Sequence, residues 1–336
     1  MVAELLSSGS VVERSGRPGA SGRGRPANLL SVAGADAVVV GIDFGHRHVR
    51  VALGDGTRRI LGEELVEVDV DRHASDALDG AADLLASLLT HIGVKRDDIR
   101  AGAAGIPGPI DAANPSMRPP SILASWAGLD LREELRARIG VPMAVDNDAN
   151  CGALGELEFG AGRGHRDFVY IKASHGIGAG VIIDGRVYRG ASGTAGEIGH
   201  TQVDPNGQWC RCGNRGCLET IVSIDVVRRQ LGALGIDPLD GKEITHPVAR
   251  KVLAESGRTV GRAIADMCNL LDPGMVILGG DLSVTGRAFV DGVRDSIERL
   301  AQPGASTSVA VLTAELGRRS ELLGALASAL AKVTVD

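Results

Sequence analysis

The stretch Ala37-Val-Val-Val-Gly-Ile-Asp-Phe-Gly45 decides the fold, because its apolar run ends abruptly at a carboxylate and a glycine. A short continuous apolar run rich in valine predicts a buried β-strand. Val49-Arg-Val-Ala-Leu53 is mostly apolar and predicts an antiparallel hairpin partner. A third strand is expected near residues 64–70.

The second half of the chain repeats this plan. Residues 168–173 and 179–183 predict two strands joined by a glycine-rich turn, and Asp184-Gly185 predicts a further hairpin turn. Because both halves open alike, the sequence predicts a duplicated, two-lobed architecture. A ligand would then bind in the cleft between the lobes.

Helices and strands alternate along the rest of the chain, which predicts the α/β fold class. One helix is expected to begin at an N-cap, Ser75, and to end at Gly93. The remaining elements are predicted as helices at 130–139, 247–271, 284–299 and 318–332, and as strands at 99–105, 142–145, 275–278 and 308–312. The predicted units are residues 1–36, an N-terminal lobe of 37–150 with about 318–336, and a C-terminal lobe of 151–317.

Length and composition fit this organisation. A chain of 336 residues is too long for a single compact core. The net charge of −6 gives no general reason to expect binding to nucleic acid or membranes. The sequence has no apolar stretch of the roughly 18 residues needed to span a bilayer and no recognisable signal peptide, so we expect a cytoplasmic protein without a membrane partner.

Four residues predict a metal site. His200, Cys210, Cys212 and Cys217 have the spacing H-x9-C-x-C-x4-C. One imidazole and three thiolates form a closed tetrahedral ligand set that suits Zn²⁺ and leaves no position open for water. We therefore expect a structural zinc ion. The alternative is a chance cluster of free thiols.

The zinc motif also carries a resemblance to a known family. Glu197-Ile-Gly-His200, followed by Cys210-x-Cys212-Gly-x-x-Gly-Cys217-Leu-Glu219, resembles the ROK family of repressors, open reading frames and sugar kinases. Three further stretches match the family, and all of them lie in the family's order along the chain: 105–111, Asp146-Asn-Asp-Ala-Asn150 and 269–280. The resemblance runs from about residue 37 to the end. It implies the two-lobed, actin-like fold of sugar kinases and Hsp70.

The resemblance also implies a sugar pocket. Its residues would be Asn147, Asp148, Glu197, His200 and Glu219. In a kinase, Asp148 would be the general base that takes the proton of the attacking hydroxyl. His200 would bind zinc with one ring nitrogen and face the sugar with the other, so that the ion fixes the orientation of the ring.

The phosphate loops depart from those of the family's kinases, which open with Asp-x-Gly-Gly-Thr-Lys. Here the sequence is Asp43-Phe-Gly-His-Arg-His48, and the usual Gly-Thr-Gly-Ile-Gly is Ser174-His-Gly-Ile-Gly178. Side chains in place of glycine obstruct a close approach of phosphate. The expected nucleotide-binding residues are Asp43, Gly45, Gly176, Gly178, Gly279 and Gly280. The alternative is a working kinase that tolerates these changes and uses His46, Arg47 and His48 as positive charges.

The N-terminal 36 residues resemble the end of the winged helix-turn-helix that precedes the sugar domain in the family's regulators. Residues 2–14 and Gly22-Arg-Gly-Arg-Pro26 match the tail of its recognition helix and its wing. We expect a residual wing and linker without the first two helices, so that DNA would be a partner only if those helices were restored. By composition alone, residues 13–26 are either a solvated linker or a basic loop that contacts phosphates.

These features together predict a sugar-binding transcriptional regulator of carbohydrate metabolism that lacks most of its DNA-binding head. The alternative is an ATP-dependent hexose kinase of the glucokinase or N-acetylmannosamine kinase type, which would use Mg-ATP. Efficient phosphoryl transfer is not expected, because it depends on accurate positioning of the phosphates. The resemblance further implies a homo-oligomer.

Overall fold

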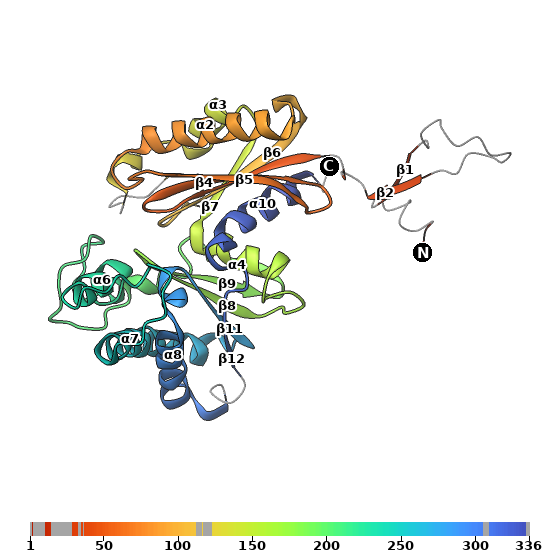
Figure 1. Ribbon diagram of the computed structural model, residues 1–336. Coiled ribbons are helices and arrows are strands. Elements are labelled where there is room, and N and C mark those ends of the chain that lie inside the picture. The colour runs from red at the N-terminus through yellow and green to blue at the C-terminus, as the bar shows by residue number, and fades with distance from the viewer. Residues whose placement is uncertain are drawn as a thin grey trace.

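The protein folds into two lobes, each built on a five-stranded mixed sheet (Figure 1). The computed structural model describes residues 37–111, 123–304 and 309–333. It also describes Val2, residues 11–14 and 29–32, Ala35 and Ser116.

The first sheet contains the strand that opens the predicted fold. Its strands are β3 (Val38–Phe44), β4 (His48–Asp55), β5 (Ile60–Glu67), β6 (Ile99–Ile106) and β7 (Met143–Asn147), in the order β5-β4-β3-β6-β7. β3 to β5 form an antiparallel meander, and β6 and β7 continue from β3 in parallel. The predicted strand at residues 64–70 is misplaced, because β5 begins and ends earlier.

The second sheet repeats this topology. Its strands are β8 (Phe168–Ala173), β9 (Ile177–Ile183), β10 (Arg186–Tyr188), β11 (Met275–Gly279) and β12 (Ala310–Thr313), in the order β10-β9-β8-β11-β12. The meander from β8 to β10 and the parallel continuation through β11 and β12 match the first sheet strand for strand. The predicted duplication is therefore confirmed.

Helices cover the outer face of each sheet (Figure 1). On the first sheet these are α2 (Ala74–Ile92) and α3 (Leu131–Ile139); on the second they are α6 (Ile224–Gly232), α7 (Pro247–Leu271) and α8 (Arg287–Leu300). A four-residue helix, α5 (Leu218–Ile221), follows the cysteine-rich loop. Short 3₁₀ helices lie at Arg96–Asp98, Ala124–Trp126, Ile198–His200, Asp281–Thr285 and Gly317–Arg319.

Two helix starts differ from the prediction. Ser75 is not an N-cap: α2 already begins at Ala74, and its N-cap residue His73 makes no capping hydrogen bond. Gly93 does end α2, with φ of 75°. The helix predicted over 284–299 begins later because its first residues belong to the 3₁₀ turn Asp281–Thr285.

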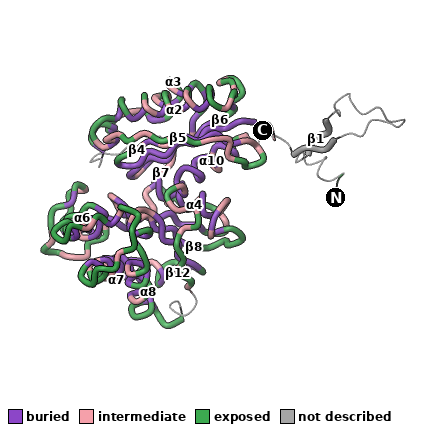
Figure 2. Tube along the Cα trace, viewed as in Figure 1, coloured by how far each residue is buried: buried purple, intermediate pink, exposed green. Residues whose placement is uncertain are grey.

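Two further helices, α4 (Asp148–Phe159) and α10 (Ser320–Val333), lie between the sheets and pack on each other (Figure 1). α10 buries Leu322 and Leu326 against Val39 of the first sheet, while Ala153 of α4 packs on Phe168 of the second. Burial is continuous through this junction (Figure 2). The two lobes therefore meet along the α4–α10 contact.

Glycines allow that contact to be close. A β-carbon on Gly324 would lie 1.7 Å from the carbonyl oxygen of Cys151, and one on Gly155 would lie 2.1 Å from that of Ser320. Nearby, the fully buried carboxylate of Glu156 accepts hydrogen bonds from the Ser320 hydroxyl at 2.8 Å and the Leu316 amide at 3.1 Å. These bonds fix the start of α10 against α4.

Near the N-terminus, β1 (Val11–Arg14) and β2 (Leu29–Val32) pair in antiparallel register, with Val11 opposite Val32. The rest of the segment predicted to be a wing, including Gly22-Arg-Gly-Arg-Pro26, lies outside the described residues. The wing therefore stays a prediction. Among the described residues, no helix is both long and apolar enough to cross a bilayer.

Replacing Gly324 with alanine is expected to lower the free energy of unfolding by about 2–3 kcal/mol, because the new methyl group would overlap backbone and force α4 and α10 apart. Urea unfolding followed by circular dichroism measures this loss. The matched control is Gly232→Ala in α6, where an added β-carbon meets nothing within 4 Å. Equal effects of the two substitutions would contradict the proposed role of the glycine contact.

Candidate functional site

The structure brings the four predicted metal ligands together. One ligand atom from each of His200, Cys210, Cys212 and Cys217 lies within 4.8 Å of all the others. His200 Nδ1 is 3.6 Å from Cys210 Sγ, and Cys212 Sγ is 3.7 Å from Cys217 Sγ. Among the described residues, this is the one cluster of three or more such ligands with this geometry.

These separations fit a zinc ion. A tetrahedral site with bonds of about 2.3 Å to sulfur and 2.0 Å to nitrogen has sulfur–sulfur edges of about 3.8 Å and nitrogen–sulfur edges of about 3.6 Å. Glycines close the loop around the site: Gly213 and Gly216 have φ of 94° and 61°, which other residues rarely adopt. The chemistry and spacing of the donors therefore suit a structural tetrahedral metal ion.

The residues predicted to bind sugar line one small pocket between the lobes. Asn147 and Asp148 come from the junction of β7 and α4. Glu197 and His200 come from the 3₁₀ turn before residues 201–217, which we call the metal loop because they contain the three predicted cysteine ligands. Glu219 comes from α5. The pocket holds about 40 Å³. That is room for a few water molecules.

His200 lies between the small pocket and the predicted cysteine ligands. Its Nδ1 faces Cys210, while its Nε2 lies 3.7 Å from Oε2 of Glu197 on the pocket side. Nδ1 also lies 3.7 Å from Oε1 of Glu219. The predicted division of the ring nitrogens between a metal ion and a sugar stays a prediction. Burial, together with the charges of Asp148 and Glu219, raises the pKa of Glu197 to about 7.

The side chain of Asn147 uses most of its hydrogen bonds within the protein. Its side-chain oxygen accepts hydrogen bonds from the amides of Ala149 and Asn150, which caps α4, and its amide nitrogen donates to Gly108 O at 2.9 Å. One N–H therefore remains for a ligand. The cap sets the orientation of Asp148, the first residue of the helix.

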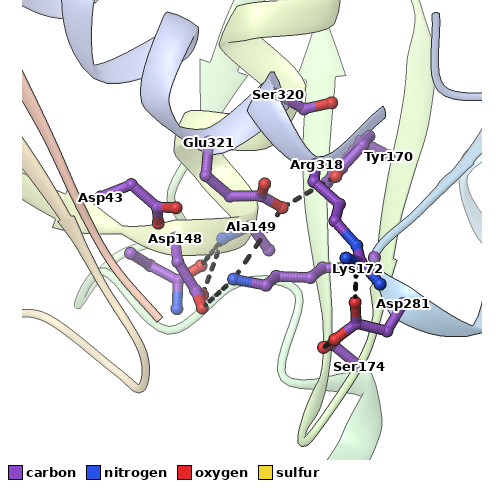
Figure 3. A network of polar contacts seen from close by, with 12 residues as sticks. Asp43, Asp148, Ala149, Tyr170, Lys172, Ser174, Asp281, Arg318, Ser320 and Glu321 are labelled. Atoms are coloured by element: carbon purple, nitrogen blue, oxygen red, sulfur yellow. Dashed lines mark hydrogen bonds and ion pairs between the residues drawn. The ribbon is translucent and has the colours of Figure 1, made fainter. Parts of the chain in front are cut away.

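A buried ion pair that sequence reasoning missed holds Asp148. Lys172 reaches from β8 and places Nζ 2.8 Å from Asp148 Oδ2 and 3.9 Å from Glu321 Oε1 (Figure 3). Burial alone would lower the pKa of Lys172, but the charges of Asp148, Glu321 and Asp43 raise it well above its ordinary value. Lys172 therefore stays charged. The available signal was a single lysine within the apolar strand Phe-Val-Tyr-Ile-Lys-Ala.

Glu321 ties this network to α10. Its Oε1 accepts a hydrogen bond from the hydroxyl of Tyr170 at 2.9 Å (Figure 3). Burial raises the pKa of Glu321, more than the nearby charge of Lys172 lowers it. Asp43, Asp148, Lys172 and Glu321 thus form one cluster contributed by both lobes.

The expected nucleotide residues separate into different places. Asp43, Gly45 and Gly280 line a cleft of about 720 Å³ between the lobes. Gly176 and Gly178 line the small sugar pocket instead. Gly279, at the end of β11, packs so closely on Tyr170 that a β-carbon there would lie 2.1 Å from its hydroxyl.

His48 fills the phosphate loop. Its Nε2 lies 3.0 Å from Asp43 Oδ2, and a β-carbon on Gly45 would lie 2.2 Å from its ring. Burial would raise the pKa of Asp43, but the hydrogen bond and charge of His48, with Lys172 and Arg50, hold it below its ordinary value. The imidazole therefore covers the backbone and carboxylate that a phosphate–magnesium group would approach.

Comparisons with known proteins identify the family. The model of the ROK family matches residues 39–332. The chain belongs to the ROK family. The predicted resemblance is confirmed, and the comparison extends through both lobes.

The relatives include both regulators and kinases. The chain is 28% identical to a xylose repressor of Caldicellulosiruptor bescii over 96% of this chain and 85% of the repressor. It is 32% identical to a glucokinase of Streptomyces coelicolor over 86% of this chain and 96% of the glucokinase. The crystal structure of a ROK glucokinase from Streptomyces griseus with glucose and AMPPNP superposes with a TM-score of 0.77 at 29% identity, covering 87% of this chain and 99% of that one. The predicted actin-like fold is thereby confirmed.

We predict that Cys212→Ser will lose a bound metal ion that the unaltered protein holds at about one Zn²⁺ per chain, because a hydroxyl is a poor ligand for zinc. Elemental analysis after exhaustive dialysis measures the content. Cys268→Ser, at a buried cysteine of α7 outside the cluster, is the control and should keep its zinc. Full zinc content in Cys212→Ser would refute the ligand assignment.

Lys172→Met is expected to lower the free energy of unfolding by about 3–5 kcal/mol, because it leaves buried carboxylates without their cation. Adding Asp148→Asn removes one of these charges and should recover part of the loss. A double-mutant cycle from urea unfolding measures this coupling. Additive losses would show that Lys172 and Asp148 do not stabilise each other.

Proposed function

We propose that the protein is a sugar-sensing transcriptional regulator whose inter-lobe pocket binds a sugar without phosphorylating it. The observation that carries this proposal is the buried ion pair between Lys172 and Asp148. Asp148 is the carboxylate that a kinase of this family would use as its general base.

A general base needs a free oxygen within hydrogen-bond reach of the hydroxyl that it deprotonates. Each oxygen of Asp148 already accepts one hydrogen bond: Oδ2 from Lys172 at 2.8 Å, and Oδ1 from the amide of Ala149 at 2.8 Å. To take the proton of a sugar hydroxyl, Asp148 would have to neutralise its charge beside the buried ammonium of Lys172. Binding of the sugar needs only that Asp148 accept a further hydrogen bond, because each carboxylate oxygen has two lone pairs.

The phosphate side of the cleft supports the same proposal. Phosphoryl transfer needs the nucleotide phosphates and Mg²⁺ close to the acceptor. The ring of His48 lies on Gly45 and bonds to Asp43, where these groups would have to sit. Three histidines line this cleft, and each ring is held by an aspartate: His46 by Asp71, His48 by Asp43 and His175 by Asp225.

In this proposal, zinc has a structural role. Cys210, Cys212 and Cys217 would hold the ion together with Nδ1 of His200, which leaves Nε2 directed at the sugar. The metal loop would thereby fix one wall of the pocket. Movement of the lobes about this wall would couple sugar binding to the state of the regulator.

The N-terminal segment supports a regulator. A match to the xylose repressor over 96% of this chain must include most of residues 1–36, whereas the 86% matched by the glucokinase need not. The antiparallel pairing of β1 with β2 gives this segment the two-stranded form that a wing requires. We propose that this pair is the wing of a DNA-binding unit.

A hexose kinase is the second candidate. The presence of Asp43 in the cleft and Asp148 in the pocket, and the TM-score of 0.77 to a glucokinase, favour it. In that case the cleft of about 720 Å³ would hold Mg-ATP. Asp148 would then have to take up a proton beside the ammonium of Lys172 during each turnover.

We expect the purified protein to be stabilised by at least one sugar in a thermal-shift panel of neutral pentoses, hexoses and amino sugars. With Mg-ATP and the same sugars, a coupled assay should detect no ADP release above background. Asp148→Asn should weaken the thermal shift, because Asp148 lines the pocket. Sugar-dependent ADP release that disappears in Asp148→Asn would replace the regulator with the kinase.

A further inference from the structure

His46 separates the sugar pocket from the larger cleft. Its side chain and that of Lys172 are the two that line both cavities. The kinase motif that this sequence resembles, Asp-x-Gly-Gly-Thr-Lys, has a glycine at this position, which carries no side chain. The imidazole occupies volume at the end of the sugar pocket that faces the cleft.

The ring is held in place. His46 is 6% exposed, its Nδ1 lies 2.7 Å from Asp71 Oδ1, and its carbonyl oxygen accepts a hydrogen bond from the amide of Val70 at 3.2 Å. The other oxygen of Asp71 lies 3.8 Å from Arg211 in the metal loop. Moving the ring would therefore break a buried hydrogen bond and disturb a contact between the lobes.

The free nitrogen of the ring faces the pocket. Nε2 of His46 and Oε2 of Glu219 lie 3.6 and 3.7 Å from the point where a β-carbon on Gly176 would stand. With Nδ1 bonded to Asp71, Nε2 is left to exchange a hydrogen bond with a ligand. A sugar hydroxyl can be the partner, because it can both donate and accept.

The position of the ring limits the length of the ligand. The exocyclic hydroxymethyl group of an aldohexopyranose reaches farther from the ring than any hydroxyl, so a sugar whose C5 end faces His46 brings this group against the imidazole. The carboxylates of Asp148, Glu197 and Glu219 outnumber the single ammonium of Lys172 in the pocket, which disfavours an anionic substituent. Both considerations favour a short, neutral sugar.

We propose that His46 closes the sugar pocket at its cleft end and makes the protein selective for aldopentoses over the corresponding aldohexoses. This inference rests on the proposed sugar-binding function. It assigns His46 as a ligand-contacting, specificity-determining residue. The ring exchanges a hydrogen bond with a pentose hydroxyl through Nε2, and the same ring collides with a hydroxymethyl group.

Matched sugar pairs test the proposal directly. D-Xylose and D-glucose differ as pyranoses by the hydroxymethyl group alone, as do L-arabinose and D-galactose, and D-lyxose and D-mannose. Isothermal titration calorimetry with each pair measures the ratio of affinities in the unaltered protein, in His46→Gly and in His46→Ala. The control is His73→Gly, at an exposed N-cap position in the neighbouring loop, where glycine is tolerated.

In the pair that binds, we expect the pentose to bind about tenfold or more tightly than its hexose, as is typical when a pocket lacks room for one extra carbon group. Both His46 variants should bring this ratio close to one, while His73→Gly leaves it unchanged. The selectivity of the unaltered protein is itself a test, even if a variant does not fold.

Two other outcomes distinguish a failure of the role of His46 from a failure of the proposed function. A hexose that binds the unaltered protein as tightly as its pentose, or a ratio that both folded His46 variants leave unchanged, overturns the role of His46 and leaves the sugar-binding function intact. If no sugar in any pair binds the unaltered protein, the proposed function fails, and the inference about His46 fails with it.

Discussion

The burial of one ammonium group among three carboxylates constrains the centre of this molecule. Lys172 comes from the second sheet, Asp43 from the first, Asp148 from the start of α4 and Glu321 from the start of α10. An unpaired charge at this depth would cost several kcal/mol, so each element must keep its position relative to the others. The close glycine contact between α4 and α10 holds the two helix starts near each other. The junction of the lobes and the candidate site are therefore the same piece of structure.

The same buried charge cluster also helps to distinguish two functions that share this fold. A sugar kinase and a sugar-responsive regulator both need a pocket between two lobes, but a kinase needs in addition a free base and an open phosphate loop. Here Lys172 bonds to the carboxylate at the base position, and His48 bonds to Asp43 over Gly45. Relatives of both classes match the chain at similar identity. The arrangement of these side chains is therefore the stronger basis for the proposed regulator.

Two histidines in the walls of the small pocket are oriented by groups that lie outside the pocket. Zinc, in the proposed site, would orient His200 on one side, and Asp71 orients His46 on the other. Arg211 lies between Cys210 and Cys212 and comes within 3.8 Å of both Asp71 and Glu219. The metal loop thus contacts the first lobe at the residue that fixes His46. A change in the separation of the lobes would alter both walls together, which is what a sugar-dependent switch requires.

The sequence by itself determined the α/β class, the duplicated lobes, the family and the grouping of His200 with three cysteines. These rest on local patterns: apolar runs that fix strands, and a motif whose four residues are close in the chain. It misplaced β5, whose bounds follow its pairing with β4, and it misplaced the start of α2. Only the tertiary structure decided that Asp148 pairs with Lys172 and that Asp43 pairs with His48. Lys172 and Glu321 are 24 and 173 positions from Asp148 in the chain, and no local pattern indicates that folding places their charges side by side.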